Sequence, residues 1–156
     1  TTLAHILSGS YIALYSAGID PSQTHYVIAA IIAAGILDLD HIVSLIRDRD
    51  LYKKHGYAGH LHKARSMMHE LPGFATIGIV VLAWSFIDVT MASIVGVSFM
   101  IHLTQDVIMG KSMPFSPVDK TVIQLLPQKK AIKIVVDILT LLIFGYLWIQ
   151  YLNVHI

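Results

Sequence analysis

Two aspartates and one histidine lie close together inside a run of the sequence that is otherwise apolar. They are Asp38, Asp40 and His41, and the apolar run extends from Tyr26 to Ile46. Ionisable side chains are costly in an apolar environment, whether it is lipid or protein interior. A metal ion is the partner that would stabilise all three groups at the lowest cost. On a helix Asp38 and His41 would share a face, and Asp40 would serve as a neighbouring ligand, an orienting group or a helix-end carboxylate.

A second pair of residues with metal-binding spacing lies later in the chain. His102 and Asp106 are one helical turn apart, so a helix would place both side chains on one face. Such a pair supplies two ligands to one ion. Three further polar groups, His5, His69 and Glu70, stand at the ends of apolar segments. We therefore expect the metal ligands to be His5, Asp38, His41, His69, His102 and Asp106.

The chemistry of the site follows from the available side chains. The chain has no cysteine, so a transition-metal site must use His, Asp and Glu, a set that favours Zn²⁺, Mn²⁺ or Fe²⁺. The candidate groups exceed what one four-coordinate ion needs and predict two divalent ions, Zn or Mn, sharing a carboxylate such as Asp38 or Asp106. Paired ions are common in phosphoester hydrolysis. Glu70 or Asp40 would then act as general base, and Arg65 would contact a phosphate.

The composition indicates a membrane protein. Hydrophobic residues make up 55% of the chain and charged residues 13%, whereas soluble domains average about 45–50% and about 25%. The net charge is +1, and no broad basic patch is interleaved with aromatic residues, which argues against nucleic-acid binding. The 156 residues suffice for one domain, so we expect a single membrane-embedded domain over 1–156.

The apolar segments predict an all-α integral membrane protein with about five transmembrane helices. The run from 71 to 110 is too long for one span, and Asp88 offers a natural break within it. A set of small residues suits close helix packing, namely Ser8, Gly9, Ser10, Ala13, Ser16 and Ala17. The predicted helices cover residues 3–19, 24–46, 72–87, 90–109 and 131–152.

The basic residues predict how the helices are oriented. Every Lys and Arg lies in one of two regions, 47–65 or 111–133, which five helices would place on the same side of the membrane. The positive-inside rule makes that side cytoplasmic, so we expect a multi-pass protein with its metal site near the cytoplasmic face. We expect no cleavable signal peptide, because a basic n-region is lacking and His5 interrupts the first apolar run.

The ordered motifs resemble those of the membrane-bound metal-dependent hydrolases, distant relatives of the zinc-dependent phospholipases C. The family pattern is an early His, D-x-D-H, H-R-x-x-x-H and H-x-x-x-D, followed by a proline-containing stretch. His5, the segments 38–41 and 102–106, and Pro114–Pro117 are similar to it. Arg65 and His69 match the third motif, but Ala64 stands at its first His. The resemblance implies an all-helical fold with a cluster of metal ions.

Two classes of function fit these residues. The first is a hydrolase of a phosphoester in a lipid or another membrane-accessible substrate, and the second is a non-enzymatic membrane protein. The second class includes a metal-ion transporter and a metal-stabilised structural protein. A transporter would have ligands near the bilayer midplane and a second polar layer on the far side. Only Asp20 and Asp88 lie on that side, which favours the hydrolase.

Overall fold

A computed structural model describes residues 2–39, 46, 49–50, 69–115, 118–119, 121–126 and 130–154. This part of the chain is almost entirely helical, which confirms the predicted all-α class. It contains one two-stranded antiparallel sheet, in which Lys111 pairs with Gln124 and Ser112 with Ile123. The elements are α1 (Thr2–Ser16), α2 (Thr24–Ile36), α5 (Leu71–Ser85), α6 (Val89–Met109), β1 (Lys111–Ser112), β2 (Ile123–Gln124) and α7 (Lys130–Asn153).

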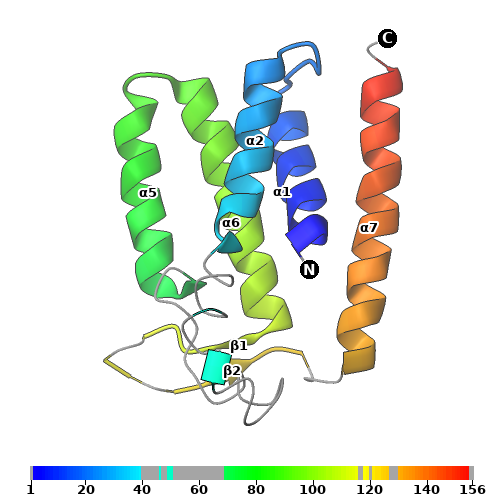
Figure 1. Cartoon of the computed structure of the whole chain (residues 1–156). Coiled ribbons are helices and arrows are strands. Elements are labelled where there is room, and N and C mark those ends of the chain that lie inside the picture. Colours follow the sequence, from blue (N-terminus) through cyan, green and yellow to red (C-terminus); the bar gives the residue numbers. More distant parts are fainter. Residues whose placement is uncertain are drawn as a thin grey trace.

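Successive helices alternate in direction within one bundle (Figure 1). α1, α2 and α6 pack against one another, α5 packs on α6, and α7 packs on α1. The end of α2 and the starts of α5 and α7 lie at the same end of the bundle, as does the end of α6 (Figure 1). This alternation is the one that the sequence predicts, and it brings the beginning of α1 toward the end of α2.

Small residues form the contact between α1, α2 and α6. Of the predicted packing residues, Ser8, Gly9, Ser10 and Ala13 on α1 are buried. Ser16 is exposed and Ala17 is only partly buried, so the close contact does not extend to the end of α1. Ala30, Ala33 and Ala34 of α2 and Ala92 and Ser98 of α6 are also buried. Small side chains allow helix backbones to approach closely, which is the usual packing mode of helices in membranes.

We expect Gly9→Ala to destabilise this contact. A Cβ atom at Gly9 would lie 3.1 Å from Ala34 Cβ and 3.2 Å from the Ser98 main-chain oxygen, and neither neighbour can rotate away. Gly78→Ala is the matched control, because a Cβ there meets nothing within 4 Å. Both variants gain helix propensity. The free energy of unfolding of Gly9→Ala should therefore be lower than that of Gly78→Ala by about 1–3 kcal/mol, because only Gly9→Ala adds a close contact. Unfolding midpoints in detergent measure this difference, and equal stabilities would contradict it.

The predicted break at Asp88 is confirmed. Asp88 precedes α6 with an extended backbone, and its Oδ1 accepts a hydrogen bond of 2.9 Å from the Met91 N–H. This is a helix N-cap, which satisfies a backbone donor that would otherwise lack a partner in the first turn. The apolar run from 71 to 110 is therefore two antiparallel helices.

The prediction of five transmembrane helices is not supported. α6 and the segment Ala131–Asn153 of α7 are long and apolar enough to cross a membrane. α1, α2 and α5 have 15, 13 and 15 residues, and a span needs about 20. α2 ends at Ile36 instead of Ile46, because the chain turns there, with the Asp38 N–H bonded to the Gly35 oxygen at 3.1 Å.

The outer surface of the bundle is rich in large apolar side chains. Most of the apolar stretch of α7 is not buried within the described chain, and Tyr151 near its end is the exception among the described residues. Ile79 on α5 is 68% exposed and Leu142 on α7 is 65% exposed. A large exposed apolar surface of this kind is expected of a protein surrounded by lipid.

Candidate metal centre

Five of the predicted ligands meet at one end of the bundle. His5 lies in the first turns of α1, and Asp38 lies in the turn after α2. His69 stands two residues before α5, and α6 carries His102 and Asp106 near its end. All five side chains are buried, and those of His69 and His102 have no exposed surface. These helix ends lie near one another in the bundle (Figure 1), as predicted from the depth of each residue.

The facing nitrogen and oxygen atoms of these side chains are 3.4 to 3.6 Å apart. His102 Nε2 lies 3.6 Å from Asp38 Oδ1 and 3.5 Å from Asp106 Oδ2. His5 Nδ1 lies 3.6 Å from Asp38 Oδ2, and His69 Nε2 lies 3.4 Å from Asp106 Oδ2. A charge-assisted hydrogen bond would be shorter, at ~2.7–2.9 Å. Ligands at ~2.0–2.1 Å from a tetrahedral ion are about 3.3–3.4 Å from each other, so the spacing fits a shared ion.

The side chains form two groups of three, each able to hold a metal ion. The first group is His5, Asp38 and His102, and the second is His69, His102 and Asp106. In each group the ligand atoms lie within 4.8 Å of one another. His102 belongs to both groups and is therefore the centre of the site.

A main-chain contact fixes how His102 presents its ring. His102 Nδ1 lies 2.6 Å from the Ala34 carbonyl oxygen, which can only accept a hydrogen bond. The Nδ1 atom must therefore carry the proton, and the lone pair of a neutral ring lies on Nε2. This is the usual device that orients a metal-binding histidine. A single lone pair binds a single ion, so the two groups share whichever ion His102 holds.

The electrostatics of the described ligands suit one divalent cation. Two carboxylates carry a charge of −2 and three neutral imidazoles carry none. Without a cation, two carboxylates buried so close together would repel each other and lack the hydration of bulk water. Nitrogen and oxygen donors without sulfur are the set that Zn²⁺ and Mn²⁺ accept.

Three predicted site residues lie outside the described residues, namely Asp40, His41 and Arg65. Glu70 is described, but its carboxylate is directed to the hairpin after α6 and not to the metal ligands. Its Oε2 accepts a 2.5 Å hydrogen bond from Ser112 Oγ, and its Oε1 accepts one of 2.9 Å from the Met113 N–H. Among the described residues, Glu70 adjoins the site as the neighbour of His69 in the sequence.

Two supporting contacts were missed at the sequence level. The Ala34 carbonyl has no signal in the sequence, because every residue has a carbonyl oxygen. Gln105 Nε2 donates a 2.7 Å hydrogen bond to Ser8 Oγ, and Ser8 Oγ donates one of 2.7 Å to the Ala4 oxygen. This chain ties α6 to α1 beside His5. The signal available for it was a polar residue, Gln105, between two predicted ligands on an apolar helix.

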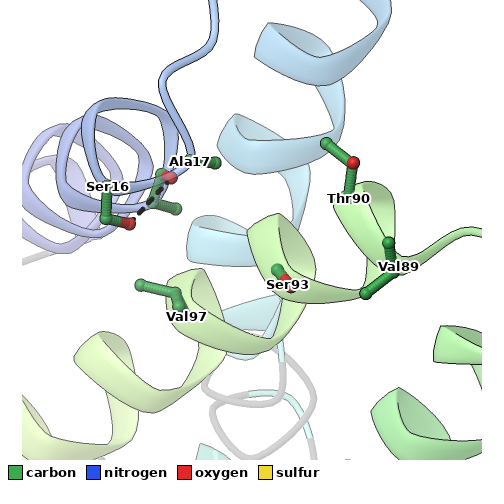
Figure 2. A pocket seen from close by; sticks show the side chains of 7 residues that line it. Ser16, Ala17, Val89, Thr90, Ser93 and Val97 are labelled. Atoms are coloured by element: carbon green, nitrogen blue, oxygen red, sulfur yellow. Dashed lines mark hydrogen bonds between the residues drawn. The ribbon is translucent and has the colours of Figure 1, made fainter.

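The described residues line two cavities at the sides of the bundle. The first lies at the opposite end from the ligands, between the end of α1 and the start of α6 (Figure 2). Its lining contains Ser16, Thr90 and Ser93 but no acid or histidine, and Ser16 Oγ is engaged with the Ala13 oxygen at 3.1 Å. The second, of about 230 Å³, is lined by Glu70, Leu71, Phe74, Val107, Ser112, Pro114 and Ile123. It adjoins the site, because Glu70 and Val107 directly follow the ligands His69 and Asp106.

Comparison with known proteins agrees with the apolar exterior and with the two helices long enough to span a membrane. The chain matches no curated protein and no solved structure. A family model described as YdjM inner membrane protein matches residues 1–155. The chain therefore belongs to the YdjM inner membrane protein family.

Proposed function

We propose that the protein is a membrane-bound metal-dependent hydrolase acting on a phosphoester. One observation carries the proposal: five buried His and Asp side chains converge at metal-ligand spacing around His102, whose ring is oriented by Ala34. Polar clusters of this kind inside membrane proteins are expensive and are retained for function. The proposed relationship to the zinc-dependent phospholipases C rests on the order of the motifs along the chain.

The proposed metal ligands are assigned from the geometry, and the roles of His41, Asp40 and Arg65 are proposed from the sequence. His5, Asp38, His69, His102 and Asp106 hold the metal, and the two carboxylates neutralise its charge. A bound divalent ion supplies a water of lowered pKa and polarises a phosphoryl oxygen. The second ion expected from the sequence would draw on His41 and on a shared carboxylate, Asp38 or Asp106, because His102 serves one ion only. Asp40 and Arg65 are the proposed general base and phosphate contact.

The cavity beside the ligands supports an amphipathic substrate. Its walls include the apolar side chains of Leu71, Phe74, Val107 and Ile123. An alkyl group placed there would be removed from water while the attached phosphoester reached the metal. A lipid phosphoester has this combination of groups, so we propose a lipid or a similar membrane-accessible molecule as substrate.

We also propose a multi-pass arrangement with the metal centre at the cytoplasmic face. The ends of α2 and α6, which border the two basic regions of the sequence, lie at the ligand end of the bundle (Figure 1). The positive-inside rule assigns that end to the cytoplasm. α1, α2 and α5 are shorter than a full span. They would cross the membrane only if residues beyond their ends completed the span or if the bilayer were locally thinner.

A metal-stabilised structural protein is the second candidate. The observation that favours it is the burial of all five ligands, since structural metal sites are closed whereas catalytic sites keep an open position. A transporter is less well supported, because the cavity at the other end of the bundle has no acid or histidine in its lining. The hydrolase and the metal-stabilised structural protein would both bind metal, but only the hydrolase would turn over a substrate.

The test combines metal analysis with an activity assay on the purified full chain in detergent. We expect stoichiometric Zn or Mn by mass spectrometry, and hydrolysis of a generic phosphodiester or of one phospholipid in a panel. Asp38→Ala should lose both. The control is Asp119→Ala, which removes an exposed carboxylate bonded to Thr121 and should change neither. Absence of metal from the wild type would overturn the centre, and metal without hydrolysis would favour the structural candidate.

A further inference from the structure

We propose that Glu70 is a positioning residue, which holds His69 in the metal centre by clamping the segment after α6 to the start of α5. The proposal rests on the metal centre proposed above and assigns a role different from that of a general base. The proposal also rests on the position of the Glu70 carboxylate, which is almost completely buried. Glu70 directly follows the proposed ligand His69, and its carboxylate is hydrogen-bonded to the segment that follows α6, the helix of Asp106.

Glu70 is the only glutamate in the chain, and its side chain is almost completely buried, at 1% exposure. Burying a carboxylate is costly unless hydrogen bonds compensate. Here both oxygens accept bonds, from Ser112 Oγ at 2.5 Å and from the Met113 N–H at 2.9 Å. Ser112 is itself buried, at 2% exposure, so the interaction is shielded from water.

A third hydrogen bond closes the clamp. The Leu71 N–H donates to the Pro114 carbonyl oxygen at 3.2 Å. Residues 70–71 are thus tied to residues 112–114 at three points, and Ser112 is also paired with Ile123 in the short sheet. The start of α5 cannot shift relative to this segment without breaking these bonds.

The clamp acts on the distance between two ligands. His69 immediately precedes Glu70, and Asp106 lies in the last turn of α6, just before the clamped segment. His69 Nε2 and Asp106 Oδ2 are 3.4 Å apart, the closest of the facing pairs described above. If the clamp is loosened, His69 loses the support that keeps its ring opposite Asp106.

The same geometry argues against Glu70 as the general base. A base must accept a proton from the attacking water, directly or through one intervening water. Each Glu70 oxygen instead holds a hydrogen bond to the hairpin segment, and Glu70 belongs to neither group of side chains that could hold a metal among the described residues. Glutamine could replace it in the clamp, because an amide oxygen accepts from Met113 and an amide nitrogen donates to Ser112 Oγ.

The test is a Co²⁺ titration of the full-length protein, followed by its visible absorption spectrum, with phosphodiester hydrolysis assayed in parallel. We expect Glu70→Ala and Ser112→Ala to weaken Co²⁺ binding by about tenfold, the lower end of the effect of residues that support metal ligands. Both should also alter the spectrum, because His69 moves. Glu70→Gln should restore affinity, spectrum and hydrolysis. Ser85→Ala is the matched control, since Ser85 Oγ bonds only to the Leu82 oxygen on an exposed part of α5.

Two results would overturn the proposal. One is wild-type Co²⁺ affinity and spectrum in both Glu70→Ala and Ser112→Ala. The other is a Glu70→Gln variant that binds Co²⁺ normally but loses hydrolysis by ~10²–10⁴-fold, the contribution of a general base. Ser112→Ala removes a single hydroxyl group from the same hydrogen bond. The test therefore still holds if Glu70→Ala does not fold. Failure of the wild type to bind Co²⁺ would instead refute the metal centre itself.

Discussion

Replacing His102 by alanine is expected to abolish metal binding and hydrolysis together. His102 is the only side chain shared by the two groups of ligands, so its loss leaves each group with two members. Its ring is also fixed by the Ala34 carbonyl, so its loss removes a nitrogen that is held in one orientation. Loss of a residue that only supports a ligand weakens metal affinity by ~10–100-fold, and loss of the shared ligand should exceed that range. A metal titration and the phosphodiester assay measure the two effects.

Two further variants make this result specific. His25→Ala removes an exposed histidine on α2 whose ring lies against Tyr26, and it should leave metal affinity unchanged. His5→Ala removes a ligand from one group only and should weaken binding less than His102→Ala does. Stoichiometric metal in purified His102→Ala would show that the ion is held elsewhere in the protein.

The convergence of ligands could be predicted because it depends on periodicity and topology. His102 and Asp106 are one turn apart on an apolar helix, and the structure places both at the inner side of α6. The break at Asp88 fixed the number of helices between the motifs, and alternation then brought His5, Asp38 and His69 to the same end. Each step uses a local pattern or a counting rule, which a single sequence contains.

The role of Glu70 could not be predicted in the same way. An acid next to a predicted ligand suggests a general base, because the local sequence shows that two residues are adjacent but not where their side chains are directed. The partners of Glu70 lie about 42 positions later, in a segment that pairs with Ile123. Contacts at such separation depend on how two loops are joined, and no periodic pattern marks them.

The helix lengths show a second limit of the sequence. Hydropathy locates apolar segments, but it does not show where the backbone turns within one. The run from Tyr26 to Ile46 is apolar throughout apart from its motif, yet α2 ends at Ile36. Ending the helix there lets Asp38 reach His5 and His102 on two other helices.

Removing the metal is expected to lower the thermal stability of the protein. A ligand that binds only the folded state stabilises it by about 2.7 kcal/mol when its free concentration is 100 times Kd. For a chain of this size each kcal/mol corresponds to about 2–4 °C in Tm. A chelator should therefore reduce Tm by about 5–10 °C, and added Zn²⁺ or Mn²⁺ should restore it. The physical cause is the pair of buried carboxylates, Asp38 and Asp106, which would lose the cation that balances their charge.

A variant that lacks one ligand separates the Tm change caused by metal loss from other effects of the chelator on the detergent or the protein. Asp106→Asn removes one negative charge and one ligand, so the variant should bind metal weakly and its Tm should not respond to the chelator. Its metal-free form should also be more stable than the metal-free wild type, because one buried carboxylate then replaces two. A chelator shift of equal size in Asp106→Asn and wild type would assign the effect to something other than this site. No shift in a wild type shown to contain metal would mean that the folded state does not depend on the ion.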